Sequence, residues 1–243
     1  MGGTFLNMIT VAIGSLIGLV IGDRLPQKIQ QSVITALGLV TLFVGFSNAG
    51  STGNIIIPLI SLVLGVIIGE LLDLEGKLER FGGWLQTRFA GGGSDNADAR
   101  TRFITGFVTV SLIFCIGPLA FVGSMQDGMG LPVGFQQLAI KSVLDGFAAI
   151  AFASTFGIGV MFTLITILLV QGSLALIGSA VGAIFTTPMI NEMTAVGGLM
   201  LIGLSLILLD IKRPRIANFL LALIIAPLIV AIAGALGINI YPL

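Results

Sequence analysis

Lys141 and Asp145 are ionisable residues that stand one helical turn apart in an otherwise apolar stretch, Leu131–Gly159. A charge inside a bilayer-spanning helix is costly, so such residues usually face protein or water and often belong to a transport pathway. In the functional interpretation, Asp145 binds a cation or proton, and Lys141 competes for it or contacts an anionic substrate. In the alternative, the two side chains form a salt bridge that neutralises itself, since intramembrane charges commonly pair.

Two amides and a second acid are further candidates for a substrate or ion site. Asn7 and Gln171 lie on the glycine faces of apolar helices and could supply neutral ligands. Glu192 lies in the opening turns of a helix that begins near Thr187-Pro188. It either contributes to the site or only complements the positive dipole at the start of that helix.

Gly117-Pro118 interrupts the apolar run near 103–123, and more glycines and polar residues follow it. Non-helical backbone at membrane depth is tolerated only against protein or a water-filled cavity. We therefore predict a broken helix or re-entrant segment that contributes Gly117, Ser124 and Asp127 to the site. The alternative is a plain extracellular loop that starts at the end of the apolar run.

Small residues form a stripe on the helix that carries Lys141 and Asp145. They are Ser142, Gly146, Ala149 and Ala153, at steps of four, three and four residues. This spacing places them on one face, where another helix backbone can approach closely. Gly14 and Gly18 form a similar stripe in the first apolar run. These Gly/Ala stripes indicate helix packing, either within the chain or in a homodimer.

The composition is that of an all-α, polytopic integral membrane protein. Hydrophobic residues make up 56% of the chain and charged residues 9%, whereas soluble domains average about 25% charged residues. Lys and Arg balance Asp and Glu at 11 each, and without a basic stripe we expect no nucleic-acid partner. The chain has no His and a single Cys, so we expect no metal site, cofactor or disulfide. We also expect no enzymatic activity, because no nucleophile–base pair is visible.

Apolar runs long enough to cross a bilayer, about 20 residues each, recur about eight times. They lie near 4–22, 28–47, 54–72, 103–123, 133–154, 158–183, 189–210 and 215–236. With eight spans, the loops that carry Lys and Arg follow the first, third and seventh spans and share one side of the membrane. The positive-inside rule makes that side cytoplasmic, and both termini then lie outside.

Two parts of the chain share short sequence elements. GSLIG at 14–18 matches GSAVG at 178–182, and an amide stands seven residues before the first glycine in each copy. TALG at 35–38 matches TAVG at 194–197. An offset of five spans inserts the copies in opposite orientations, as in the inverted repeats of many secondary transporters. The sequence therefore predicts that spans 1–3 and spans 6–8 form an inverted repeat.

The predicted organisation is a single membrane domain over 1–243. The first repeat covers 1–73 and the second covers 158–243, with two central spans at 103–157. The segment 74–102 is predicted to be a cytoplasmic amphipathic helix followed by a linker, because apolar side chains recur there every three or four residues between charged ones.

Several segments resemble a known family. They are IFCIGPLAFVGSMQDGM at 113–129, KSVLDGFAAIAFASTFG at 141–157, LGVIIGE at 64–70 and TTPMINEMTAVGGL at 186–199. Together they resemble the YqgA/YdfK-like bacterial membrane proteins, domain of unknown function 554, over nearly the whole chain. The resemblance implies a multi-pass protein of the bacterial inner (plasma) membrane and implies no activity. VLDGFA at 143–148 is also similar to a pore-helix pattern of the lysine exporter/manganese exporter superfamily, although the lack of paired intramembrane acids argues against manganese.

Three functions fit these observations. The first is a secondary transporter of a small solute, coupled to a proton or cation, that works by alternating access around the Lys141/Asp145 site. The second is a channel, for which the spans carry few polar residues. The third is a non-transporting membrane scaffold or sensor, which the glycine stripes would suit. The expected partners are the lipid bilayer and, for the first two functions, a small-molecule or ion substrate.

Overall fold

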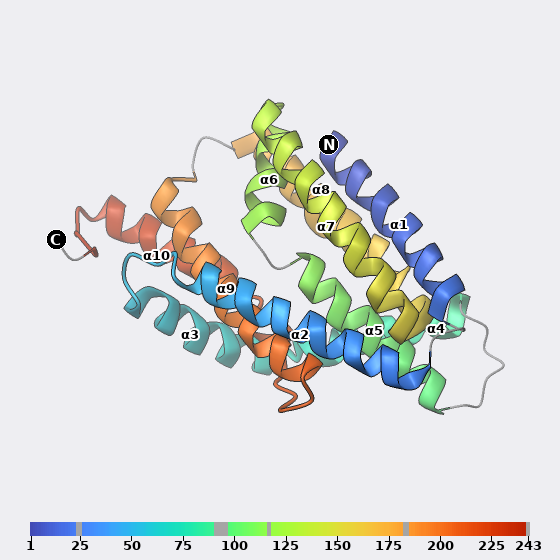
Figure 1. Cartoon of the computed structure of the whole chain (residues 1–243). Coiled ribbons are helices and arrows are strands. Elements are labelled where there is room, and N and C mark those ends of the chain that lie inside the picture. The colour runs from blue at the N-terminus through green and yellow to red at the C-terminus, as the bar shows by residue number, and fades with distance from the viewer. Residues whose placement is uncertain (23–25, 90–96, 116–117, 182–184, 242–243) are drawn as a thin grey trace. The chain divides into compact units, whose positions relative to one another are not determined.

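The protein is all-helical in the part of the chain that the structure describes. The computed structural model describes residues 1–22, 26–89, 97–115, 118–181 and 185–241. These hold ten α-helices and two short 3-10 turns, with no strand among them (Figure 1). The helices are α1 (Gly2–Gly22), α2 (Gln27–Ala49), α3 (Ile56–Leu72), α4 (Leu74–Phe89), α5 (Ala97–Cys115), α6 (Pro118–Gly128), α7 (Pro132–Phe156), α8 (Thr163–Val181), α9 (Thr187–Leu208) and α10 (Ala222–Ala235). The predicted fold class is confirmed.

Five helical stretches among the described residues are long and apolar enough to cross a membrane. They are Gly2–Gly22, Pro132–Val160, Thr163–Ala180, Thr187–Leu208 and Ile216–Ala235. The number rises to seven if each of two bent pairs, α3 with α4 and α5 with α6, forms one span. The apolar part of α2, Ile34–Ala49, is shorter. The polytopic character is therefore confirmed, whereas the count of eight spans and the orientation stay predictions.

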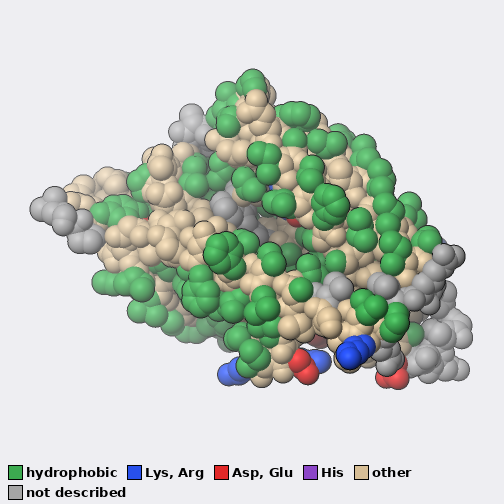
Figure 2. All heavy atoms as spheres, viewed as in Figure 1, with side chains coloured by type: hydrophobic (Ala, Val, Ile, Leu, Met, Phe, Trp, Pro, Cys, Tyr) green, Lys and Arg blue, Asp and Glu red, His purple; other side chains and the backbone are tan. Residues whose placement is uncertain are grey.

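Many large apolar side chains on these helices are exposed, and Figure 2 shows apolar side chains spread over the face in view. On α1, Phe5, Ile13 and Val20 are exposed, whereas Asn7 and Ser15 are fully buried. A helix that turns apolar side chains outward and polar ones inward suits a lipid environment, because unpaired polar groups are costly there.

The helices α5 and α6 form a bent pair, as the sequence predicts for a broken span. α5 ends at Cys115, α6 begins at Pro118, and the two helices are bent by 63°. Proline suits the first turn of a helix, where its missing N–H would have no partner in any case. A proline also cannot continue a helix that precedes it, because its ring clashes with the preceding turn. α6 runs as a helix to Gly128, so the alternative of a plain loop from the end of the apolar run is wrong.

The chain divides into two compact units. Unit 1 comprises residues 1–37 and 77–182, and unit 2 comprises residues 38–76 and 183–243. These boundaries differ from those of the predicted repeat, because α1 belongs to unit 1 and α3 to unit 2. The inverted repeat and its domain boundaries stay predictions.

In unit 1, α1 packs directly against α7, and Figure 1 shows the two helices side by side. A Cβ at Gly14 would lie only 2.2 Å from the carbonyl oxygen of Gly146. The predicted stripe on α7 is buried at Ser142, Gly146, Ala149 and Ala153. α6 and α8 approach each other as closely, since a Cβ at Gly178 would lie 2.1 Å from the carbonyl oxygen of Met125. The predicted helix-packing role of the small residues is confirmed.

In unit 2, glycines of α3 let it pack on the segment that leads into α10. A Cβ at Gly69 would lie 1.9 Å from the carbonyl oxygen of Asn218. Near the same end of α3, Arg215 binds Glu70 at 2.8 Å and Asp73 at 2.7 Å. The hydrogen bond to Asp73, with the negative charge of Glu70, raises the pKa of Arg215 above its ordinary value. These two ion pairs join α3 to the chain before α10.

Candidate functional site

Lys141 and Asp145 form a buried ion pair on α7. Their exposed fractions are 7% and 8%. The fully buried Asn7 of α1 donates a hydrogen bond from Nδ2 to Oδ2 of Asp145 at 3.0 Å, and Lys141 donates to the same oxygen. No described group donates a hydrogen bond to Oδ1, so this oxygen can still accept a proton or coordinate a cation.

The glycine contact between α1 and α7 is what brings Asn7 to the ion pair. Asn7 precedes Gly14 by two helical turns, so both residues lie on the face of α1 that meets α7. Gly146 of α7 lies one residue after Asp145 and receives the closest approach of α1. A bulkier contact would hold the two backbones apart and move the Asn7 amide out of hydrogen-bond range.

The ion pair lies at the level where the α5–α6 span is broken. The Lys141 ammonium is 5.7 Å from the centre of the Phe114 ring, a distance at which a cation is attracted to the ring face. Phe114 precedes Cys115, the buried last residue of α5. Gly117, a predicted site residue, lies outside the described residues.

Gln171 of α8 is fully buried, and neither its Nε2 nor its Oε1 has a hydrogen-bond partner among the described residues. The buried hydroxyl of Ser124 on α6 also has no hydrogen-bond partner among the described residues. Buried polar atoms in native proteins are nearly always hydrogen-bonded to protein or water. These two predicted site residues therefore have capacity for a water molecule or a bound solute.

Gln171 belongs to α8, a helix that packs against α5. The helix α5 runs alongside the 3-10 turn Gly157–Val160 and then α8, in the same direction. A Cβ at Gly159 would lie 2.3 Å from the carbonyl oxygen of Phe103, and the Thr166 hydroxyl donates to Ser111 at 2.8 Å. Gln171 follows Thr166 by five residues, which places it level with the end of α5 at about 1.5 Å per residue.

Asp127 binds the N-terminal end of α1. Its Oδ2 accepts the backbone N–H of Gly3 at 3.1 Å and lies 3.1 Å from the amino group of Met1. The first N–H groups of a helix have no intrahelical partner, and an acid near them also complements the helix dipole. Asp127 therefore holds the start of α1 and makes no contact with Lys141.

Glu192 belongs to unit 2 and has its own partners there, Thr52 and Gly53. Of the predicted site residues, the structure thus brings together Lys141, Asp145 and Asn7. Gln171 and Ser124 belong to the same unit, without a hydrogen bond to these three residues. Asp127 and Glu192 make other contacts.

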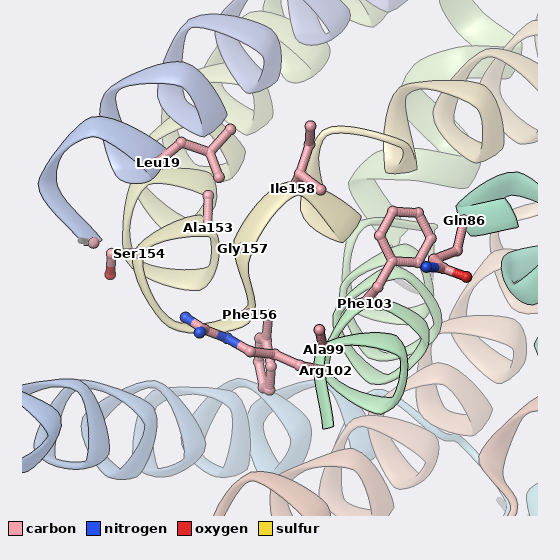
Figure 3. Close-up of a pocket in the computed structure, with 11 residues that line it drawn as sticks. Leu19, Gln86, Ala99, Arg102, Phe103, Ala153, Ser154, Phe156, Gly157 and Ile158 are labelled. Atoms are coloured by element: carbon pink, nitrogen blue, oxygen red, sulfur yellow. The ribbon is translucent and has the colours of Figure 1, made fainter. Parts of the chain in front are cut away.

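Sequence reasoning missed Arg102, which lines a cavity of about 300 Å³ at the C-terminal end of α7 (Figure 3). Its Nε donates to the carbonyl oxygen of Thr155 at 2.5 Å. A cation at this end satisfies a free carbonyl and complements the helix dipole. Gly157 ends α7 with a φ of +77°, a backbone conformation that favours glycine, so this glycine is the signal in the sequence for the end of the helix. No sequence pattern connects Arg102 to that end.

Comparison with known proteins agrees with this architecture. Residues 2–231 match the family described as "Protein of unknown function (DUF554)". The chain belongs to the DUF554 family. The resemblance seen in the sequence is therefore confirmed.

Two DUF554-related proteins cover nearly the whole chain. "Uncharacterized membrane protein YdfK" of Bacillus subtilis (strain 168) is 27% identical over 243 residues, which cover 98% of this chain and 100% of the relative. "Uncharacterized protein YqgA" of Escherichia coli (strain K12) is 32% identical over 225 residues, covering 92% of this chain and 94% of the relative. No solved structure matches. The name of the first relative supports the membrane character of this DUF554 chain.

Proposed function

We propose that the protein is a secondary transporter of a small solute, coupled to a proton or another cation that binds Asp145. The observation that carries the proposal is the carboxylate of Asp145, which is buried, paired with Lys141, and has one oxygen without a hydrogen-bond donor among the described residues. A buried ion pair is not needed for stability, because apolar residues of similar volume often serve as well. Its presence in a helix that is long and apolar enough to cross a membrane therefore favours a functional role.

The geometry supports a competition at Asp145. A proton or cation on the carboxylate weakens the ion pair of Asp145 with Lys141 and its hydrogen bond with the Asn7 amide. The freed ammonium can then bind an anionic group of the solute, while Gln171 has both amide groups available. A bound ion drives a conformational change only as far as it prefers one conformation over another. Here the preference would arise from the contact of Asn7 with Asp145, which joins α1 to α7.

The broken helix supports transport as well. Transporter sites commonly lie where a helix is interrupted near mid-membrane, because the free backbone groups there can bind the solute. The end of α5 lies beside the Lys141 side chain, as the contact with Phe114 shows.

A non-transporting scaffold or sensor is the second candidate, and the close glycine packing of α1 on α7 favours it. This packing also bears on the proposed homodimer. The stripes that suggested it are used within the chain, since Gly14 and Gly18 both lie against α7. A homodimer would therefore form through other surfaces.

Purified protein in liposomes that enclose a pH-sensitive dye tests the proposal. The panel of external solutes would include alkali cations, amino acids and small organic anions, with protein-free liposomes as the control. A carrier is expected to give a saturable, protein-dependent pH change with at least one solute. Unitary conductance in planar bilayers would support a channel instead. A panel that gives neither a pH change nor sodium- or potassium-dependent solute uptake would support the scaffold.

We further propose that the protein lies in the bacterial inner membrane with both termini outside. Single cysteines introduced in a Cys115→Ala background test this orientation with a membrane-impermeant thiol reagent. Ser51→Cys, between the second and third predicted spans, is expected to react in intact spheroplasts. Ser94→Cys, in the loop after the third span, is expected to react only after permeabilisation. The reverse pattern would contradict the orientation.

A further inference from the structure

Glu192 is a fully buried carboxylate on α9 in unit 2. The hydroxyl of Thr52 donates to its Oε2 at 2.6 Å, and the backbone N–H of Gly53 donates to its Oε1 at 2.9 Å. The Thr52 oxygen in turn accepts the backbone N–H of Asn54 at 3.1 Å. Each carboxylate oxygen thus accepts one neutral donor, although the two oxygens together offer about four acceptor positions.

The described part of unit 2 places no cationic side chain against this carboxylate. α9 has no other charged residue, and α10 has none. Neither the turn at 52–54 nor the first turns of α3 contain an ionisable group. In the segment 238–241 the only such group is Tyr241. The charged residues around Arg215 lie near the other end of α3, roughly 20 Å away at 1.5 Å per residue.

Tyr241 lies against the same site. A Cβ at Gly53 would lie 2.7 Å from the ring of Tyr241 and 3.8 Å from Oε1 of Glu192. Burial, followed by the negative charge of Glu192, raises the pKa of Tyr241. Tyr241 also lines a cavity of about 380 Å³, formed with apolar residues of α9 and α10.

We propose that Glu192 binds a univalent cation, either a proton or an alkali-metal ion, with Thr52 as its second oxygen ligand. Buried charges in proteins are paired or coordinate a cation, because an isolated charge in an apolar interior is very costly. The donors from Thr52 and Gly53 are neutral, so the bound cation supplies the missing positive charge. This site lies in unit 2 and does not depend on the proposed role of Asp145.

Tyr241 is the only tyrosine in the chain, so its ultraviolet absorption reports on Glu192 without interference from another tyrosine. The purified full-length protein would be titrated with base in detergent, with choline, sodium or potassium chloride as the salt. Glu192→Gln keeps the size and an acceptor for Gly53 but removes the charge. It is expected to lower the pKa of Tyr241, because the negative charge of Glu192 contributes to raising it. Glu70→Gln, at the other end of α3, is the control and is expected to change nothing.

The two cations give different results. If an alkali ion binds, sodium or potassium lowers the pKa of Tyr241 relative to choline in the wild type but not in Glu192→Gln. If a proton binds, the salts act alike, and infrared difference spectra across pH show a protonated carboxylic acid that Glu192→Gln removes and Glu70→Gln retains. The proposal is overturned if neither a salt effect nor such an acid signal depends on Glu192.

Thr52→Val serves as a second variant in case Glu192→Gln does not fold. It keeps the carboxylate and removes the hydroxyl ligand, so it is expected to weaken the alkali-ion effect several-fold or to move the pH midpoint of the acid signal. A Thr52→Val protein that matches the wild type in both measurements would contradict the proposal.

Discussion

Lys141→Gln alone, or Asp145→Asn alone, is expected to destabilise the folded protein by about 3–5 kcal/mol, and the double variant is expected to recover most of that loss. Removing one partner leaves the other charge buried without compensation, and this cost falls in that range for buried ion pairs. In the double variant, Gln and Asn stand one turn apart and can form a neutral hydrogen bond. The Asn7 amide also keeps an oxygen acceptor at position 145.

Thermal unfolding at a fixed scan rate measures this cycle, with size-exclusion profiles in detergent as a check on folding. The interaction energy is the stability change of the double variant minus the sum of the stability changes of the two single variants. Asp210→Asn is the matched control, because Asp210 forms an ion pair with Arg213 on the surface, and its side chain is 83% exposed. Additive effects of the Lys141 and Asp145 changes would contradict the buried ion pair.

Gly14→Ala is expected to lose about 3 kcal/mol of stability and to separate Asn7 from Asp145. The new methyl group would lie 2.2 Å from the carbonyl oxygen of Gly146. One of these atoms is part of the backbone and the other is attached to it, so no side-chain rotation can relieve the clash. The helices must therefore move apart, which is the costly form of overpacking. A glycine-to-alanine change in a helix otherwise gains about 1 kcal/mol, so the predicted sign is opposite to that of helix propensity.

Gly172→Ala on α8 is the control for this prediction. The nearest atom to a Cβ there is 3.8 Å away, an ordinary contact, so the variant is expected to be neutral or slightly more stable. Thermal unfolding compares the two proteins under one set of conditions. Equal stability of Gly14→Ala and the wild type would mean that α1 does not pack on α7 as described.

The sequence was sufficient to predict features that depend on neighbours along the chain. The one-turn spacing of Lys141 and Asp145, the stripe of small residues beside them and the break before Pro118 are all local patterns with direct structural consequences. The membrane class follows from composition alone, because so apolar a chain cannot fold around a single soluble core.

Contacts between distant residues could not be predicted. Asn7 reaches Asp145 across 138 positions, and Glu192 binds Gly53 across 139. A single sequence shows that such polar residues need partners but does not show which helices meet. The sequence alone therefore groups Asp127 and Glu192 with the ion pair, whereas in the structure Asp127 binds the start of α1 and Glu192 belongs to the other unit.

The transport proposal is tested most directly by the double variant Lys141→Gln/Asp145→Asn in dye-loaded liposomes, with a solute to which the wild type responds. This variant is expected to fold and to insert like the wild type, yet to give no solute-dependent pH change. Asp210→Asn is expected to respond as the wild type does. A folded double variant that retains the wild-type response would show that the ion pair takes no part in transport.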